Sequence, residues 1–198
     1  MRATIDMNCV IDLELHQGAE THLRELIRLH DRGQITICVP AIQASERLLN
    51  GSYAPSFSEF QRRVSRLSSR EFKLLRPLGY VGITYVGWCM IAGEESTLLE
   101  ERIHKVLFPG KESKWQAHAE LCGLDPERAP KRQHGEWVKW RNRKSDTLAM
   151  WCHIHYQCDC FVTRDRNFHK KTKKPALVGL GARSILSPKD AVRFVLQR

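Results

Sequence analysis

Short runs of β-branched residues alternate with helical segments, and this alternation limits the fold more than any other feature of the chain. Residues 3 to 6 and 8 to 11, in "ATIDMNCVI", predict a short strand that ends at an acid and passes into a helical segment. The segment "GAETHLRELIRLHDRG" predicts a helix closed by Gly33, and "QITICVP" predicts a strand stopped by Pro40. A helix is then expected in "AIQASERLLNG". The order β, α, β, α predicts parallel strands joined by helical crossovers.

The C-terminal part of the chain repeats this pattern. "SDTLAMWCHIHYQ" predicts a helix with Ser145 as its N-cap and Asp146 in its first turn. "CDCFVT" predicts a strand that ends at Thr163, just before Asp165. "GARSILSPKDAVRFVLQR" predicts a last strand and a closing amphipathic helix that begins at Pro188. The fold class that follows is a three-layer α/β/α domain with a central, mainly parallel sheet of at least four strands.

The middle of the chain, residues 51–143, is less regular. "SFSEFQRRVSRLSSREFKLL" and "EESTLLEERIHKVL" predict helices, whereas "GYVGITYVGWCMIAG" suits an extra strand, a hairpin or an irregular loop equally well. A length of 198 residues fits one domain with an elaboration. We therefore expect a single domain, 1–198, in which residues 51–143 form an insertion, either a helical lid or a side lobe.

Composition indicates a globular protein that is not inserted in a membrane. Hydrophobic residues make up 42% of the chain and charged residues 27%, and no apolar run approaches the roughly 18 residues that a membrane span needs. Acids interrupt the apolar residues of "MRATIDMNCVIDLEL", which argues against a signal peptide and for a cytoplasmic location. The seven cysteines are odd in number and scattered, so we expect buried thiols rather than disulfides.

A net charge of +10 favours a polyanionic partner, and the charge is concentrated in two runs. These are "RAPKRQHGEWVKWRNRK", residues 128–144, and "RDRNFHKKTKK", residues 164–174. The candidate nucleic-acid-binding cations in them are Arg141, Arg143, Lys144, Arg164, Arg166, Lys170 and Lys171. Trp137 and Trp140 lie among these cations and could stack unpaired bases or could pack a helix face onto the core.

Four acids are predicted to converge at one edge of the sheet. In an open parallel sheet, ligands bind at the carboxyl ends of the strands. The acids expected there are Asp6, Glu46, Asp146 and Asp165. Each one alone also suits a turn, a cap or a solvated helix face. Together, however, four like charges would raise one another's pKa unless cations were bound, and oxygen-rich sites of this kind suit Mg²⁺ or Mn²⁺.

Several motifs carry a resemblance to a known family. "TIDMNCVID", "VPAIQASERL", "KSDTLAM", "CFVTRDRNF" and "ILSPKDAVRFVL" resemble, in order, the motifs of PIN-domain nucleases, which include VapC-type toxins and RNA-processing endonucleases. The resemblance covers roughly residues 3 to 50 and 144 to 197 and departs from the family in the long middle segment. It implies that the four acids are the metal-site positions, with Asn8 and Thr163 as accessory polar residues.

The function expected from this resemblance is metal-dependent hydrolysis of phosphodiester bonds by a Mg²⁺- or Mn²⁺-activated water, with RNA rather than DNA as substrate. Two alternatives remain: a DNase with the same site, and a catalytically inactive PIN-like module that binds nucleic acid or protein. The candidate partners are nucleic acid, an antitoxin or other protein, and a second copy of the chain.

Two other kinds of site are less well supported by the sequence. A zinc site is suggested by Cys152, His153, His155, Cys158 and Cys160, but the two histidines face opposite sides of a helix and no spacing resembles paired ligands. Asp6 also suggests a phosphatase that uses an aspartate nucleophile. Such enzymes need a second acid where this chain has Asn8.

Overall fold

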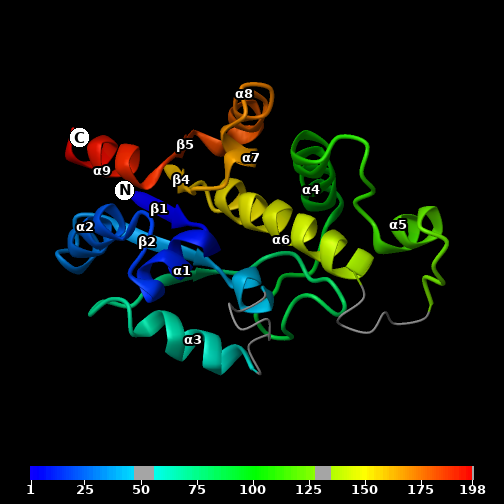
Figure 1. Ribbon diagram of the computed structural model, residues 1–198, viewed down its shortest axis with the longest axis horizontal. Coiled ribbons are helices and arrows are strands. Elements are labelled where there is room, and N and C mark those ends of the chain that lie inside the picture. Colours follow the sequence, from blue (N-terminus) through cyan, green and yellow to red (C-terminus); the bar gives the residue numbers. More distant parts are fainter. Residues whose placement is uncertain (47–55, 128–134, 198) are drawn as a thin grey trace.

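The fold is built on a five-stranded sheet in which every pair of neighbouring strands is parallel (Figure 1). The computed structural model describes residues 1–46, 56–127 and 135–197. The strands lie in the order β3-β2-β1-β4-β5. Their bounds are β1 Arg2–Ile5, β2 Thr36–Pro40, β3 Lys73–Leu75, β4 Cys160–Val162 and β5 Ser184–Leu186. The predicted parallel sheet is confirmed.

Helices cover both faces of the sheet, which gives the expected three layers. The helices that share a core on one face are α1 Met7–Leu15, α2 Glu20–Asp31, α3 Phe57–Ser65 and α9 Pro188–Leu196. Those that share the core on the other face are α4 Glu94–Leu107, α5 Trp115–Leu121, α6 Gly135–His155 and α8 Lys174–Leu177, with the short η2 Val178–Ala182. Figure 1 shows α6 crossing the molecule between the sheet and α4.

The strands alternate their side chains between the two cores. Ile37 and Val39 of β2 pack into the core under α1 and α2, while Cys38 between them packs into the core under α6. In β1, Thr4 points to the second face, where its hydroxyl bonds Nδ1 of His153 at 3.0 Å. This period of two is the reason why short strands of three to five residues can serve both layers.

The helix that carries Asp146 begins earlier than the sequence predicts. The cap pattern predicts a start at Ser145, but α6 begins at Gly135 and runs for 21 residues, so Ser145 is no cap and Asp146 lies in the helix interior. The reason is packing, because Trp137 and Trp140 in the preceding turns are buried in the core under α6. At 1.5 Å per residue the helix is about 31 Å long, roughly twice the length of the longest strand, so it extends well past the edge of the sheet.

The segment after β2 also differs from the prediction. The helix expected from Ala41 is a 3₁₀ turn, η1 Ala41–Ser45, which ends at Glu46, and Leu48 and Leu49 lie outside the described residues. The tight turn still places Glu46 directly beyond the end of β2.

Residues 51–143, predicted as an insertion that forms a helical lid or a side lobe, contain both helices and a strand of the main sheet. Helix α3 ends at Ser65, and β3 pairs with β2 as an edge strand of the main sheet. Asp31, at the end of α2, fixes the turn between them by accepting hydrogen bonds from the Ser68 hydroxyl at 2.6 Å and the Arg70 amide at 3.1 Å. The glycine-rich part, residues 79–93, is a turn-rich loop. Part of the range therefore belongs to the domain core.

Other predictions from the sequence are confirmed. Ser187 caps α9 through the amide of Asp190, and Pro188 is its first residue. All seven cysteines are free, and five of them are buried, namely Cys9, Cys38, Cys152, Cys158 and Cys160. None of the helices in the described ranges is long and apolar enough to cross a membrane.

A buried ion pair joins α4 to α6. The Lys144 ammonium donates to Glu100 at 2.8 Å, and both side chains have no exposed surface. The Lys144 ammonium also donates to the Tyr80 hydroxyl and to the Ser113 hydroxyl, each at 3.0 Å. Because all three ammonium hydrogens find acceptors, the charge is tolerated in the core.

Removing one partner of this pair should destabilise the fold strongly. We expect Lys144→Met to lower the free energy of unfolding by about 3–5 kcal/mol, because Glu100 would be left buried without a counter-charge. The double variant Lys144→Met/Glu100→Leu should recover most of the loss. Urea unfolding followed by circular dichroism measures both, with Lys105→Met, an exposed lysine of α4, as a control expected to change stability by less than about 0.5 kcal/mol. Equal stability of Lys144→Met and wild type would contradict the role assigned to the pair.

Candidate functional site

The order of the strands creates a crevice between β1 and β4. From β1 the chain continues to β2 and β3 on one side, whereas β4 continues to β5 on the other side. Such a switch in strand order, at the carboxyl ends of the strands, is where open α/β sheets bind ligands. Asp6 follows β1 directly, and Thr163 and Asp165 follow β4. The fold therefore brings two of the predicted acids to the expected binding position.

Asp6 is held in a network of hydrogen bonds. It caps α1 by accepting from the Met7 amide at 2.8 Å through Oδ1. Its Oδ2 accepts from the Asn8 side-chain amide at 2.7 Å and from the Thr163 hydroxyl at 2.6 Å. Asn8 also contacts the Thr163 hydroxyl at 3.0 Å. Asn8 and Thr163 thus lie where the sequence predicts them, and they fix the orientation of the carboxylate.

Asp165 is connected to the same network. Its backbone amide donates to the Thr163 hydroxyl at 3.0 Å, and its side chain accepts from the Asn167 amide at 2.8 Å as the N-cap of α7, Arg166–His169. Both Asp6 and Asp165 are therefore helix caps, as the simpler interpretation of the sequence allows. This capping role leaves one oxygen of the Asp165 carboxylate without a hydrogen bond among the described residues.

Glu46 and Asp146 approach from the other side of the crevice. The guanidinium of Arg141, one turn before Asp146 on α6, donates to the carbonyl of Ser45, which precedes Glu46. This contact ties the middle of α6 to the end of η1. Both acids are half-buried. Asp146 thus faces the other acids from the interior of α6, whereas the sequence predicts it in the first turn of a helix capped by Ser145.

The four acids lie close enough to perturb one another. Burial raises the pKa of Asp6 to about 6, with a further contribution from Asp165. Burial and the charge of Asp6 raise the pKa of Glu46 to about 8. Burial, followed by repulsion from the other three acids, raises the pKa of Asp146 well above its ordinary value. Asp6 therefore lies within electrostatic range of Asp165, Glu46 and Asp146.

Two arginines oppose this negative charge. Arg141 and Arg63 both lower the pKa of Glu46, although burial and Asp6 outweigh them. Arg63, on α3, is also held by ion-pair contacts with Glu14 of α1. No motif in the sequence indicates Arg63, since only the packing of α3 against α1 brings it near the acids.

The donor set fits a hard divalent cation. The side chains are carboxylates, which are oxygen ligands of hard divalent cations, and a bound cation would offset the burial and repulsion that raise the pKa values of Asp6, Glu46 and Asp146. In the described part of the chain, however, no three of these acids bring their oxygens all within 4.8 Å of one another. The arrangement is more open than a compact chelate, which suits Mg²⁺ because this ion usually keeps several of its waters.

Several predicted nucleic-acid contacts are corrected by their burial. Lys144 is fully buried in its pair with Glu100, and Arg141 is only 7% exposed. Arg143 is half-buried beside His118. Trp137 and Trp140 are 7% and 2% exposed and pack against each other and Trp115, which is the core-packing alternative that the sequence leaves open.

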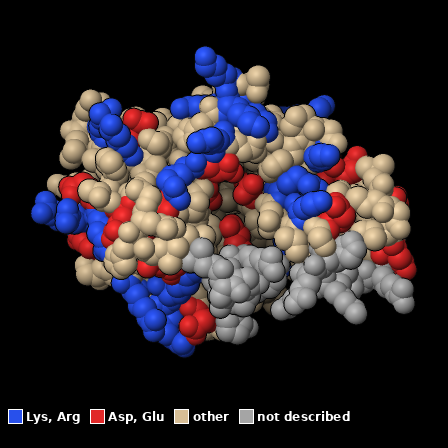
Figure 2. Space-filling view, in the orientation of Figure 1, with Lys and Arg blue, Asp and Glu red and all other residues tan. Residues whose placement is uncertain are grey.

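The second basic run remains on the surface. Arg166, Lys170 and Lys171 are exposed, whereas Arg164, although 42% exposed, pairs with the buried Asp12 at 2.5 Å. Figure 2 shows Asp and Glu side chains inside a hollow near the centre of one face, with Lys and Arg side chains around part of its rim. A negative centre with positive surroundings is the arrangement expected for binding a polyanion through metal ions.

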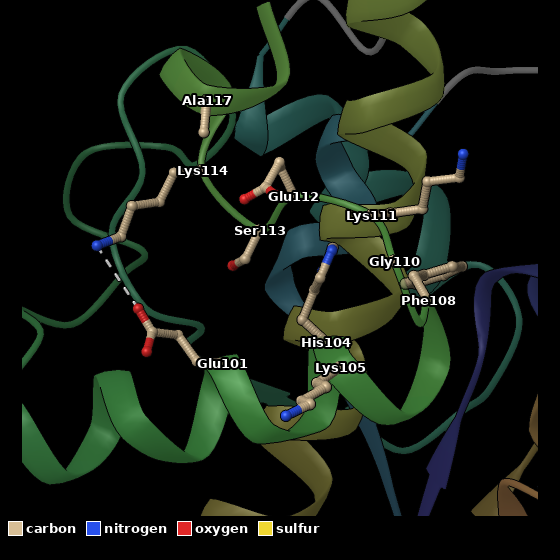
Figure 3. Close-up of a pocket in the computed structure, with 10 residues that line it drawn as sticks. All are labelled: Glu101, His104, Lys105, Phe108, Gly110, Lys111, Glu112, Ser113, Lys114 and Ala117. Carbon is tan, nitrogen blue, oxygen red and sulfur yellow. Dashed lines mark ion pairs between the residues drawn. The ribbon is translucent and has the colours of Figure 1, made fainter. Parts of the chain in front are cut away.

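Other polar clusters lie apart from the acids. A pocket of about 350 Å³ between α4 and residues 110–114 contains the Glu101–Lys114 ion pair, 3.6 Å long, and none of the four acids lines it (Figure 3). The cysteines and histidines of residues 152–160 do not converge as metal ligands in the described chain. His153 bonds Thr4 and the Ala182 carbonyl instead.

Comparison with known proteins adds no assignment. No family model matches the chain, and searches of curated proteins and of solved structures give no significant match.

The raised pKa values predict how the stability of the metal-free protein depends on pH. Asp6 and Glu46 keep their protons in the folded state up to about pH 6 and pH 8, whereas in the unfolded state they release them near their ordinary values of 3.8 and 4.5. Folding is therefore increasingly opposed as pH rises from about 4 to 8. We expect the melting temperature without metal to fall by several degrees between pH 5 and pH 8, and Mn²⁺ to raise it more at pH 8 than at pH 5.

Thermal unfolding in metal-free buffer and with Mn²⁺ measures this effect. In Asp146→Asn the fall in melting temperature between pH 5 and pH 8 should be smaller, because one source of repulsion is gone. The rise in melting temperature on adding Mn²⁺ should be smaller as well. Glu95→Gln, an exposed acid at the start of α4, is the matched control and should behave as the wild type. A Mn²⁺ effect that is the same at both pH values would show that the acids do not bind the ion.

Proposed function

We propose that the chain is a metal-dependent nuclease of the PIN-like class that hydrolyses phosphodiester bonds, with RNA as its substrate. The observation that carries the proposal is the convergence of four carboxylates from separate segments at the crevice between β1 and β4, with the pKa values of three raised. Asp6 and Asp165 also cap helices, but capping does not account for Glu46 at the end of η1 or Asp146 in the interior of α6.

Further support comes from the residues around Asp6. The family resemblance assigns accessory positions to Asn8 and Thr163, and both side chains bond the carboxylate of Asp6. The basic run at residues 164–174 contains Asp165, so exposed cations lie next to the acidic centre along the chain. A structural role for the acids alone would not require this arrangement.

The chemistry divides between the bound ions and the side chains. Mg²⁺ or Mn²⁺, held by Asp6, Glu46, Asp146 and Asp165, would supply an activated water and neutralise charge at the scissile phosphate. Asn8 and Thr163 hold the Asp6 carboxylate in one orientation, so it does not have to reorganise when a substrate binds. Arg166, Lys170 and Lys171 would hold neighbouring phosphates, which the acids alone would repel.

Loss of an acid should abolish cleavage and leave the fold intact. We expect the wild type to cleave labelled single-stranded RNA in the presence of Mn²⁺, and Asp6→Asn or Asp165→Asn to reduce the rate by at least about a hundredfold. Parallel reactions with single-stranded DNA distinguish a ribonuclease from a DNase with the same site. EDTA should stop the reaction.

Glu95→Gln is again the control, and circular dichroism should show that all variants are folded. If wild type and Asp6→Asn have the same residual activity, the nuclease proposal fails. Binding of RNA by a wild type that cuts neither RNA nor DNA would instead identify a catalytically inactive binding module.

The exposed cations should contribute to affinity rather than to chemistry. We expect alanine at Arg166, Lys170 and Lys171 to weaken RNA binding at low salt and to reduce the slope of log K against log[salt] by roughly one for each phosphate that is no longer neutralised. Fluorescence anisotropy across a salt series measures the slope. Lys189→Ala, on α9, is the control, and an unchanged slope in the triple variant would place the RNA elsewhere.

A further inference from the structure

A second group of potential metal ligands lies between α5 and α6. His118 and Cys122 are four residues apart, on α5 and at its C-cap, and Glu136 is in the first turn of α6. The His118 Nε2 lies 3.4 Å from the Glu136 Oε2, and the Cys122 Sγ lies 3.8 Å from each of these two atoms. In the described ranges this is the only trio of His, Cys, Asp or Glu ligand atoms that all lie within 4.8 Å of one another.

These separations match those around a tetrahedral zinc ion. Zinc binds sulfur at about 2.3 Å and nitrogen or oxygen at about 2.0–2.2 Å, so a tetrahedral angle places neighbouring ligand atoms about 3.3–3.6 Å apart. The 3.4 Å separation lies within this range, and the two 3.8 Å separations exceed it by about 0.2 Å. Carboxylate, imidazole and thiolate are also the ligand types that zinc takes from proteins, whereas Mg²⁺ prefers oxygen alone.

The two helices are held in place by contacts that do not involve the three ligands. Trp115 of α5 packs edge-on against Trp137 of α6 with 4.9 Å between ring centroids, and Trp140 completes the aromatic group. Both helices are therefore positioned by the core, and the ligands need only small side-chain movements to bind an ion. Such preorganisation favours binding, because less freedom is lost.

The surroundings leave the ligand atoms accessible. Lys139 bonds Oε1 of Glu136 at 2.7 Å, so Oε2 is the oxygen that faces the histidine and the cysteine. The Nη2 atom of Arg143 lies 3.4 Å from Nδ1 of His118 and 3.5 Å from Nε2. A strong hydrogen bond needs the donor in line with the lone pair of one nitrogen, and a donor almost equally far from both nitrogens is in line with neither. Cys122 is exposed, which gives an ion a path from solvent.

We propose that His118, Cys122 and Glu136 form a zinc site that is separate from the four-carboxylate centre. Glu136 precedes Asp146 by ten positions on α6, which corresponds to about 15 Å along the helix axis. Three protein ligands leave the fourth tetrahedral position to a water molecule. Because the ligands come from α5 and α6, the bound ion links α5 to the helix that carries Asp146.

Metal titration of the full chain tests the site. The metal-free protein is titrated with Zn²⁺ in the presence of excess Mg²⁺, which occupies oxygen-only sites, and with Co²⁺ to detect the thiolate-to-cobalt absorption band. We expect one Zn²⁺ per chain and a thiolate band in the wild type. Cys122→Ser should abolish the band, and Cys122→Ser and His118→Gln should each weaken zinc binding by at least the roughly 10- to 100-fold that loss of a supporting outer-shell group costs.

Cys89→Ser is the matched control, since it removes a partly exposed thiol outside the group, and it should bind as the wild type. Asp6→Asn should also retain zinc, which separates this site from the nuclease proposal. The inference is overturned if the wild type takes up no Zn²⁺ under these conditions, if Cys122→Ser keeps the band, or if Asp6→Asn is the variant that loses the ion.

Discussion

Repulsion among four carboxylates is the constraint on which the arrangement around the crevice depends. Asp6, Asp165, Glu46 and Asp146 come from four separate segments, and burial first, then their mutual repulsion, raise the pKa values of Asp6, Glu46 and Asp146. The local structure offsets part of this repulsion through the amide of Met7, the side chains of Asn8 and Thr163, and the guanidinium of Arg141. The remaining charge is what a divalent cation would neutralise.

Helix α6 is the element that makes this collection of acids feasible. It lies between the sheet and α4, which it contacts through Lys144, Thr147 and Trp151, and its first turns pack Trp137 and Trp140 against Trp115 of α5. The buried Lys144–Glu100 pair fixes its rotation, because the ammonium must point at Glu100, Tyr80 and Ser113. Lys144 and Asp146 point to different sides, and the same helix therefore carries both a structural charge and a candidate catalytic one.

The sequence predicts the parts of the fold whose signals are local. The strand stopped by Pro40 and the cap-and-proline start of α9 follow from adjacent residues, and so do the acids at the strand ends. Prediction fails where distant packing decides. Ser145 has the side chain of a good cap, but burial of Trp137 and Trp140 continues the helix through it. Strand β3 is missed because Lys73–Leu75 closes a segment whose pattern predicts a helix, and only the pairing with β2 makes it a strand. The basic run around Lys144 predicts that this lysine is a surface cation. The prediction is wrong because its buried partner, Glu100, is far away in the sequence.

One property of α6 links distant parts of the molecule. An unbroken helix moves as a rod, so a displacement of its first turn at Glu136 is carried along its axis to Asp146. A change that shifts the tryptophan-packed end by a fraction of an ångström would alter the spacing of the acids without touching any of them. Substitutions around α5 and the first turn of α6 would therefore act from a distance on the geometry at the crevice.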